Sequence, residues 1–265
     1  MQKIFRKPFI SIIMNCYNGE KYLKTSIQSL VSQSYKNWEL IFWDNKSTDK
    51  SKTIFFEFND NRFKYFKSKK FLKLYEARNY AIEKARGKYI CFLDVDDWWT
   101  RDKLLKQIIM IRNNKSINFI YSNFYIYNQK KKTKKVFSKN LLPEGKITQK
   151  LLDNYSIGIL TVMVNKKIIK KKKFNKKFNI IGDFDLFIRL SKEIKFFCIQ
   201  KPLAYNRFHA DNYSNLKLRE YLDELSLWLL KIKNNSSFKD FSFFNIILFK
   251  TKIKIKLILK YLIGR

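Results

Sequence analysis

The feature that most constrains the fold is a regular alternation of strand-like and helix-like segments over the first 112 residues. Short apolar runs at 9–14, 38–43 and 88–93 suit strands that are covered on both faces. Helical spacing of apolar residues follows the first run, from Leu23 to Val31, and recurs at Leu74–Ala85 and Arg101–Arg112. Such alternation builds a mostly parallel sheet with helices on both faces, so the sequence predicts an α/β fold.

The second half of the chain is less regular. The basic stretch 128–140 predicts a solvated hairpin or loop, Ile159–Val164 a strand, Asp183–Lys192 a helix, and Ile194–Gln200 and Leu203–Phe208 two strand-like runs. No internal repeat or clean linker interrupts this part of the sequence. We therefore expect one catalytic domain over residues 1–215, with C-terminal helices over residues 216–265.

The net charge of +34 limits the classes of partner. Of the 56 basic residues, 46 are lysine and only 10 are arginine. A protein built to read phosphates is expected to favour arginine, whose planar fork binds them bidentately. We therefore attribute most of the lysine excess to compositional drift, although a surface this basic still attracts anionic membranes. Apolar residues make up 46% of the chain, which excludes a disordered protein.

The cysteines and the N-terminal residues indicate in which cellular compartment the protein is expected. Cys16, Cys91 and Cys198 are widely spaced in or beside apolar runs and form no Cys-x-x-Cys pair, so we expect buried thiols. Residues 1–8 carry no apolar core with a cleavage site, and no apolar run reaches the length of about 18 residues that a membrane span needs. These observations predict a cytoplasmic protein.

Three aspartates at the end of a predicted strand carry the clearest chemical signal. Asp94, Asp96 and Asp97 directly follow the apolar run 89–93. In open α/β sheets ligands collect at the carboxyl ends of strands. Clustered carboxylates repel one another unless a cation is present, and their oxygens suit Mg²⁺ or Mn²⁺. The alternative is that an aspartate caps the helix starting near Thr100, for which one aspartate would suffice.

Four segments in order resemble the family 2 glycosyltransferases. The resemblance covers residues 8–112 continuously and residues 180–214 in patches. Its motifs are Ser11-Ile12-Ile13-Met14-Asn15-Cys16-Tyr17-Asn18, Ile41-Phe42-Trp43-Asp44-Asn45-Lys46-Ser47-Thr48-Asp49, Ala77-Arg78-Asn79 and Ala85 to Asp97. The resemblance implies a GT-A-like fold, with a nucleotide-sugar half at about 8–112 and an acceptor half at about 113–215.

The resemblance also implies roles for individual residues on the donor side. Asn18 and Asp44 would lie at the nucleotide, with Asp44 on the base, and Arg78 would lie nearby. Asp94 would face the ribose and sugar. The metal that bridges the diphosphate would be held by a separate group of residues, namely Asp96, Asp97 and His209, with Asp97 either assisting or only orienting the loop. The sequence departs from the usual turn at Asn45 and Lys46, where the family has Asp and Gly; a positive φ would strain Lys46.

Asp183 is the predicted catalytic base. Sugar transfer to an alcohol needs a base that takes the hydroxyl proton, and a carboxylate near a helix N-terminus is held rigidly. The family carries a Glu-Asp pair here; Asp183 matches its Asp, and Gly182 replaces its Glu. The alternatives are an N-cap role for Asp183 and an i, i+4 pair between Asp185 and Arg189. His209, in a stretch that resembles HxxNxS, is the one histidine of the chain and could equally be structural.

The C-terminal segment Phe238–Arg265 predicts a basic amphipathic helix. Its apolar stripe runs through Phe244, Leu248, Ile255, Leu259 and Leu262, with Lys250, Lys252, Lys254, Lys256 and Lys260 off the stripe. One interpretation is docking to the inner face of the cell membrane, where a lipid-linked acceptor would lie. The other is a helix packed on the catalytic domain with its lysines outward.

Together these features predict metal-dependent transfer of a sugar from a nucleoside-diphosphate sugar to a hydroxyl of a glycan or lipid-linked acceptor. The resemblance adds inversion at the anomeric carbon and a place in cell-surface polysaccharide synthesis, for example of lipopolysaccharide. Two rivals stay open. A sugar nucleotidyltransferase would need a Gly-rich basic loop after the first strand, where this chain has Asn15 to Glu20. A nucleic-acid-binding module would have no use for the aspartates, so we expect no nucleic-acid partner.

Overall fold

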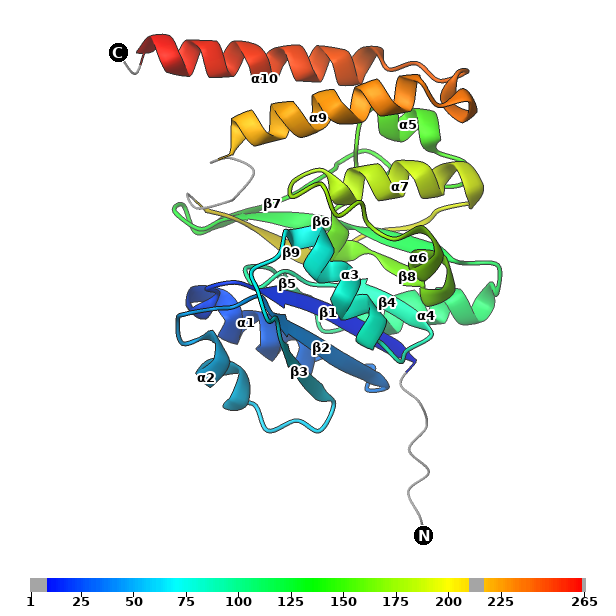
Figure 1. The fold of residues 1–265 in the computed structure, drawn as a ribbon. Helices are drawn as coiled ribbons and strands as arrows, with labels where there is room; N and C mark the ends of the chain where they lie inside the picture. Colours follow the sequence, from blue (N-terminus) through cyan, green and yellow to red (C-terminus); the bar gives the residue numbers. More distant parts are fainter. Residues whose placement is uncertain (1–8, 210–216, 264–265) are drawn as a thin grey trace.

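A nine-stranded mixed sheet runs through the part of the chain that the computed structural model describes, residues 9–209 and 217–263 (Figure 1). The strand order is β3-β2-β1-β4-β8-β6-β9-β5, and β7 pairs with β6. The strands are β1 Ile10–Cys16, β2 Trp38–Asp44, β3 Phe63–Lys67, β4 Tyr89–Phe92, β5 Trp98–Trp99, β6 Phe119–Asn128, β7 Thr133–Val136, β8 Met163–Asn165 and β9 Phe197–Phe208.

The first four strands of that order are parallel, as the alternation predicts. Ile13 of β1 lies opposite Ile41 of β2 on one side and Phe92 of β4 on the other. β3 continues the parallel pairing beyond β2. Parallel strands place their carboxyl ends at one edge of the sheet, and this edge receives the motifs that follow β1, β2 and β4.

The other half of the sheet is not mostly parallel, which corrects that detail of the prediction. β8 pairs antiparallel with both β4 and β6, while β6 and β9 run parallel. The basic stretch forms the antiparallel β6–β7 hairpin, as expected. Runs 194–200 and 203–208 contribute to one long strand, β9, in which Pro202 lies opposite Asn123 at a β-bulge. A bulge is one of the few places where proline fits within a sheet.

Residues 159–164 do not form the continuous strand that the sequence predicts. Ile159–Thr161 is a short 3₁₀ helix, and the strand β8 begins only at Met163. Side-chain donors explain the difference. Trp99 Nε1 donates to the Leu160 carbonyl over 2.8 Å, and Gln107 Nε2 donates to the Thr161 carbonyl over 2.7 Å. With these carbonyls satisfied, the segment has no need of a strand partner.

Helices cover both faces of the sheet (Figure 1). Buried residues of α1 and α4 share one core cluster with Ile12 and Met14, and buried residues of α3 and α7 share the other with Ile13. The helices are α1 Glu20–Val31, α2 Ser51–Phe56, α3 Leu74–Lys84, α4 Lys103–Asn113, α5 Thr148–Asp153, α6 Lys166–Lys172, α7 Gly182–Glu193, α9 Leu218–Lys233 and α10 Phe244–Ile263. Cys16, Cys91 and Cys198 are buried free thiols, as predicted.

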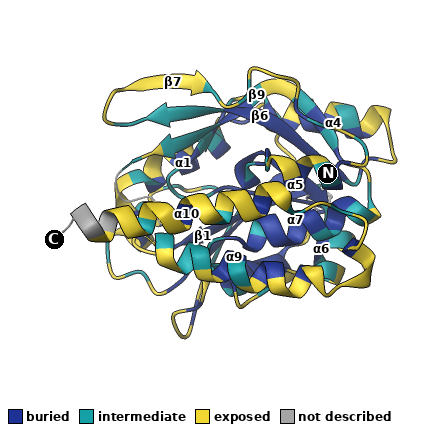
Figure 2. Ribbon diagram, turned by 90° about the horizontal axis from the view of Figure 1, so that it is seen from above, coloured by how far each residue is buried: buried dark blue, intermediate teal, exposed yellow. Residues whose placement is uncertain are grey.

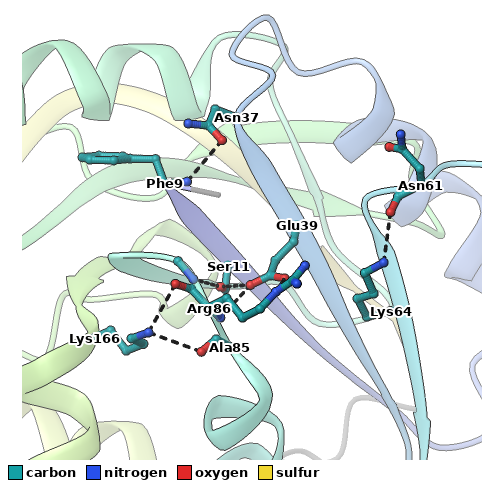
Figure 3. A network of polar contacts seen from close by, with 10 residues as sticks. Phe9, Ser11, Asn37, Glu39, Asn61, Lys64, Ala85, Arg86 and Lys166 are labelled. Atoms are coloured by element: carbon teal, nitrogen blue, oxygen red, sulfur yellow. Dashed lines mark hydrogen bonds and ion pairs between the residues drawn. The ribbon is translucent and has the colours of Figure 1, made fainter. Parts of the chain in front are cut away.

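A buried glutamate fixes the amino-terminal edge of the parallel strands (Figure 3). Glu39 of β2 accepts hydrogen bonds from Ser11 Oγ over 2.6 Å, from Arg86 N over 2.7 Å and from Arg86 Nε over 3.1 Å. Gly87 follows, and its ideal Cβ would lie 2.5 Å from Ser11 N, so the backbones approach too closely for any side chain. This network holds β1, β2 and the entry to β4 in register, at the edge away from the candidate site.

The C-terminal helix α10 packs on α9 and α5 and leaves its predicted apolar stripe exposed (Figure 2). Ile246 and Ile253 are buried on the inner face, whereas Phe244, Leu248, Ile255 and Leu259 are exposed. The helix therefore packs on the protein through one face and presents a second apolar face outward, and its docking to a membrane stays a prediction. The side chains of Lys260 and Leu262 lie outside the description. Within the described residues, no helix is both long and apolar enough to cross a membrane.

Candidate active site

The three predicted aspartates lie just beyond the carboxyl end of β4. The side chains of Asp94 and Asp96 are partly exposed, whereas Asp97 is only 4% exposed. The helix α4 has Asp102 at its N-cap position, and β5 intervenes, so none of the three caps that helix. Ser26 of α1 supports the loop by donating to the Val95 carbonyl over 3.0 Å.

Asp97 ties the acidic loop to the end of β9. Its Oδ1 accepts a hydrogen bond from Arg207 N over 2.8 Å, and both its oxygens lie 3.2 Å from Asn206 Nδ2. Burial, together with the neighbouring carboxylates of Asp96 and Asp94, raises the pKa of Asp97 well above its usual value. Three carboxylates in this setting favour a nearby cation. The contacts of Asn206 and Arg207 could not be predicted, because they depend on how β9 returns to this edge.

Asp96 of the acidic loop and His209, which follows β9, also lie close together. His209 Nε2 lies 3.1 Å from Asp96 Oδ2, which brings together residues 113 positions apart in sequence. The rest of the predicted HxxNxS stretch, from Ala210 to Ser214, lies outside the described residues. Among the described residues no group of three His, Cys, Asp or Glu side chains is arranged to hold a metal ion. The protein thus offers a carboxylate and an imidazole at this point, and the metal roles of Asp96, Asp97 and His209 stay predictions.

Helix α3 connects the acidic loop with the predicted base. Arg78 is 2% exposed and forms an ion pair with Asp94 Oδ1. One turn earlier, Tyr75 donates its hydroxyl to Asp183 Oδ1 over 2.8 Å. Residues three apart share one face of a helix, so α3 holds both carboxylates from a single face. Arg78 therefore contacts the predicted sugar-facing aspartate, and its expected contact with a nucleotide stays a prediction.

Asp183 is held by two phenols. Its second oxygen, Oδ2, accepts a hydrogen bond from Tyr155 over 3.3 Å. Burial raises the pKa of Asp183, and the hydrogen bond from Tyr75 opposes that rise. Asp183 lies in the first turn of α7 and makes no N-cap bond, so the capping alternative is wrong. The Asp185–Arg189 pair is confirmed, with 2.7 Å between Arg189 Nη2 and Asp185 Oδ2.

The surroundings of Gly182 leave no room for the glutamate that the family has at this position. The ring of Tyr75 fills the space beside Gly182, where an ideal Cβ would lie 2.3 Å from Tyr75 Cδ2. A glutamate at this position would collide with the ring. The position of the lost carboxylate is thus taken by an aromatic side chain that itself contacts Asp183.

The residues predicted to contact the nucleotide lie at the carboxyl ends of β1 and β2. Asp44 is buried; its Oδ1 accepts a hydrogen bond from Ser47 N over 2.7 Å, and its Oδ2 accepts one from the Tyr65 hydroxyl. Asn18 Oδ1 accepts a hydrogen bond from Thr48 N over 2.8 Å, which joins the two loops. Lys46 has a φ of 67°, the left-handed conformation anticipated from the missing glycine.

Asn45, the second departure from the motif, organises the next loop. Its side chain donates to the Leu72 carbonyl over 2.8 Å and accepts from Leu72 N over 3.1 Å. The neighbouring Phe71 ring then lies 4.8 Å from the ring of Tyr17, and both rings are more than half exposed. The sequence did not reveal that the exposed rings of Tyr17 and Phe71 pair beside the predicted nucleotide site.

A residue of α9 fixes the turn that leads into Asp183. Glu224 is buried and accepts three backbone hydrogen bonds, from Asn179 over 2.5 Å, from Ile180 over 2.9 Å and from Ile181 over 3.1 Å. A carboxylate at the start of a helix also interacts favourably with the helix dipole. No motif signals this role, because Glu224 lies 41 positions after Asp183 in an amphipathic helix of ordinary composition.

The structure gathers the predicted residues into one region. Asp94, Arg78 and Asp183 are linked through α3, and Asp96, Asp97 and His209 lie where the acidic loop meets the end of β9. Asn18 follows β1, and Asp44 ends the adjacent strand β2 at the same edge of the sheet. Their assigned functions stay predictions.

Comparisons with known proteins agree with this picture. Residues 11–191 match the family model described as glycosyl transferase family 2. The Escherichia coli protein WfgD, a UDP-Glc:alpha-D-GlcNAc-diphosphoundecaprenol beta-1,3-glucosyltransferase, is 33% identical over 216 residues, which cover 78% of this chain and 82% of the relative. The amylovoran biosynthesis glycosyltransferase AmsB of Erwinia amylovora is 28% identical over 241 residues, covering 87% of this chain and 79% of the relative.

Solved structures share the fold at low sequence identity. Residues 1–349 of S. aureus TarS in complex with UDP-GlcNAc superpose with a TM-score of 0.69 and 17% identity, covering 92% of this chain and 70% of that one. The mannosyltransferase PcManGT from Pyrobaculum calidifontis, in complex with GDP-Man and Mn²⁺, gives a TM-score of 0.65 at 12% identity, covering 89% of this chain and 68% of that one. These likenesses confirm the predicted GT-A-like α/β fold class.

Proposed function

The chain belongs to glycosyl transferase family 2, and from that premise we propose that it joins a sugar from a nucleoside-diphosphate sugar to a hydroxyl of a lipid-linked glycan acceptor, with inversion and with a divalent cation. The family confirms the resemblance drawn from the motifs and makes the protein a glycosyltransferase. Its named relatives act in polysaccharide biosynthesis. Both rival functions, a nucleic-acid-binding module and a sugar nucleotidyltransferase, lose their basis with this membership.

The single observation that carries the proposal is the linkage of two carboxylates through α3. Asp94 pairs with Arg78, and Asp183 accepts the Tyr75 hydroxyl from the same helix face. A carboxylate that faces the donor sugar and a carboxylate that can take a proton are thereby held in a fixed relation. Transfer between two bound substrates requires such a relation.

The donor set around Asp96 fits a divalent cation. Magnesium and its relatives usually bind one or two carboxylates and complete their shell with substrate phosphates and water, so a full protein cage is not required. Asp96 and His209, 3.1 Å apart, with the carboxyl group of Asp97 next in the same loop, suit that pattern. Bound there, Mg²⁺ or Mn²⁺ would neutralise the charge that develops on the departing diphosphate. The Mn²⁺ in the complex of the mannosyltransferase with a similar fold supports this choice.

Side chains of the protein would take the proton of the acceptor hydroxyl and bind the nucleotide-sugar donor. Asp183 would accept the proton of the acceptor hydroxyl as that oxygen bonds to the anomeric carbon and the bond to the diphosphate breaks. Asp94, oriented by Arg78, would contact the donor sugar. Near Asn18 and Asp44, the exposed rings of Tyr17 and Phe71 offer faces on which a nucleotide base can stack. The UDP-GlcNAc complex of TarS makes a uridine nucleotide the first donor class to test.

The outward face of α10 favours an acceptor that is held at an anionic membrane surface, namely the inner leaflet of the cell membrane. Exposed apolar residues run along this face opposite the buried Ile246 and Ile253, with exposed lysines beside them, among them Lys252 and Lys256. An apolar stripe between basic residues matches an interface that is both apolar and negatively charged. WfgD acts on a diphosphoundecaprenol-linked sugar, which is the class of acceptor that such a surface would present.

Two substitutions test the chemistry. Asp96→Asn is expected to weaken Mn²⁺-dependent UDP binding and to reduce transfer nearly to zero. Asp183→Asn is expected to reduce transfer by about 10²- to 10⁴-fold while leaving UDP binding unchanged. Isothermal titration with UDP and Mn²⁺ separates the two effects, and an active Asp183→Asn enzyme would exclude Asp183 as the base.

Membrane contact has its own test. Full-length protein should float with vesicles containing anionic phosphatidylglycerol and should remain unbound with neutral phosphatidylcholine vesicles. A variant with Leu248→Asp and Ile255→Asp, both on the outward face, should lose that binding while keeping its UDP affinity. Equal flotation of the variant and the native chain would remove the proposed contact.

A further inference from the structure

A pocket of about 420 Å³ lies between the candidate base and the C-terminal helices. Asp183 and Phe184 line it from α7, and Tyr155 lines it from the segment after α5. The opposite wall is built from α9 and α10, by Tyr221, Leu225, Asn245, Ile246 and Phe249. Asp94 and Asp96, the carboxylates of the proposed donor site, are not among its lining residues. The pocket therefore opens onto the base from a side that the donor residues do not line.

The lining combines aromatic rings with amide and carboxylate groups. Tyr221 of α9 packs against Phe249 of α10 with 5.8 Å between ring centroids, and Tyr155 packs against Phe184 at 5.1 Å. At the rim, Asn245 Nδ2 donates to Asp153 Oδ1 over 3.1 Å. A sugar ring presents apolar C–H faces and a girdle of hydroxyls, so aromatic rings and short polar side chains are the groups that recognise it. Among the described residues that line the pocket none has a basic side chain, which disfavours a phosphate as its occupant.

The C-terminal helices also hold the base in place. Glu224 of α9 accepts the three backbone hydrogen bonds of residues 179–181, directly before Gly182 and Asp183. Across the pocket, burial raises the pKa of Tyr221 to about 12, and the negative charge of Asp183 adds to that rise. Position and electrostatics thus connect α9 with the base.

We propose that this pocket binds a sugar unit of the acceptor, and that α9 and α10 form the wall that recognises it. The inference rests on the proposed function, in which Asp183 takes the proton of the acceptor hydroxyl. The volume lies near the lower end of the range of about 300–1,000 Å³ for small-molecule sites, which suits one or two sugar units. With the outward face of α10 on the membrane, a lipid-linked glycan would reach the pocket along the same helix.

Two neighbouring residues of α10 give a matched pair of variants. Phe249 and Leu248 are each 43% exposed, but only Phe249 lines the pocket. Full-length protein with UDP and Mn²⁺ would be titrated with methyl glycosides of glucose, galactose, mannose and N-acetylglucosamine, and binding followed by saturation-transfer difference NMR. We expect at least one glycoside to bind the native chain, and Phe249→Ala and Asn245→Ala to weaken it about tenfold or more. Leu248→Ala should leave it unchanged.

The outcomes separate this inference from the function on which it rests. UDP affinity, measured in the same samples, should be equal in all variants, which also shows that they are folded. Glycoside binding that Phe249→Ala and Asn245→Ala leave intact would overturn the pocket assignment, as would a native chain that binds UDP but none of the glycosides. A native chain that fails to bind UDP would instead overturn the proposed function, and the acceptor pocket with it.

Discussion

The hydrogen bond from Tyr75 to Asp183 provides the sharpest test of the candidate base. Tyr75 donates over 2.8 Å and Tyr155 over 3.3 Å, so Tyr75 makes the shorter of the two bonds. A hydroxyl that donates to a carboxylate stabilises its ionised form and lowers its pKa, here against the effect of burial. Tyr75→Phe removes this donor and keeps the ring that fills the space beside Gly182.

The expected size of the effect follows from the charge of the acceptor group. A hydrogen bond to an ionised group contributes about 1.5–3 kcal/mol, and one pKa unit corresponds to about 1.4 kcal/mol. Losing the Tyr75 donor should therefore raise the pKa of Asp183 further. Because only the ionised carboxylate can accept a proton, the acid limb of kcat/KM should move to higher pH by the same amount. On that limb the rate should fall about ten- to a hundredfold.

The assay is the pH dependence of nucleotide release during transfer, measured for the native chain and the variant. Tyr121→Phe is the matched control, because it also removes a buried hydroxyl, one that donates to the Pro143 carbonyl away from Asp183. That control should lose stability without moving the acid limb. An unmoved limb in Tyr75→Phe, or an equal shift in Tyr121→Phe, would refute the reasoning.

Three further predictions concern stability. Burial lowers the pKa of Lys103 to about 8, so stability should rise with pH between that value and the unfolded pKa of about 10.4. Lys103→Met should abolish the rise and stabilise the protein at neutral pH by up to about 3 kcal/mol in urea unfolding. Glu39→Ala removes the buried acceptor of Ser11 Oγ and Arg86 N and should cost about 1–3 kcal/mol, with no change in the UDP affinity of folded protein measured by titration. Gly182→Ala should destabilise by about 1–3 kcal/mol despite alanine's better helix propensity, and a double-mutant cycle with Tyr75→Ala should show that the cost depends on the ring.

The sequence predicts the donor half of the molecule well because the signals there are local. Strand, turn and helix follow one another over residues 9–112, and each parallel strand delivers its motif to one edge of the sheet. Even the departure at Lys46 could be interpreted, since a glycine in that turn implies the positive φ that the structure has. The burial of the three cysteines follows from the apolar runs around them, and the hairpin follows from its basic, polar composition.

The second half resists prediction because its contacts join residues far apart in the chain. The pairing of β8 with β4 and β6 depends on non-local register, and short runs such as 159–164 do not encode which side chains will satisfy their carbonyls. The outward apolar face of α10 shows the same limit. Periodicity found the stripe, but only packing reveals that a different face, through Ile246 and Ile253, meets the protein.

The exchange of glutamate for Gly182 shows how a departure from a motif can preserve the site that the motif describes. Taken alone, the glycine removes a side chain next to the base and leaves its surroundings undefined. The structure supplies a replacement from α3, since Tyr75 occupies the space and donates to Asp183. Tyr75 lies one turn before Arg78, which holds Asp94, so any shift of α3 moves the contacts of both carboxylates together. The relative placement of Asp94 and Asp183 thus rests on one helix face, and a sequence motif that records only these two aspartates cannot show what couples them.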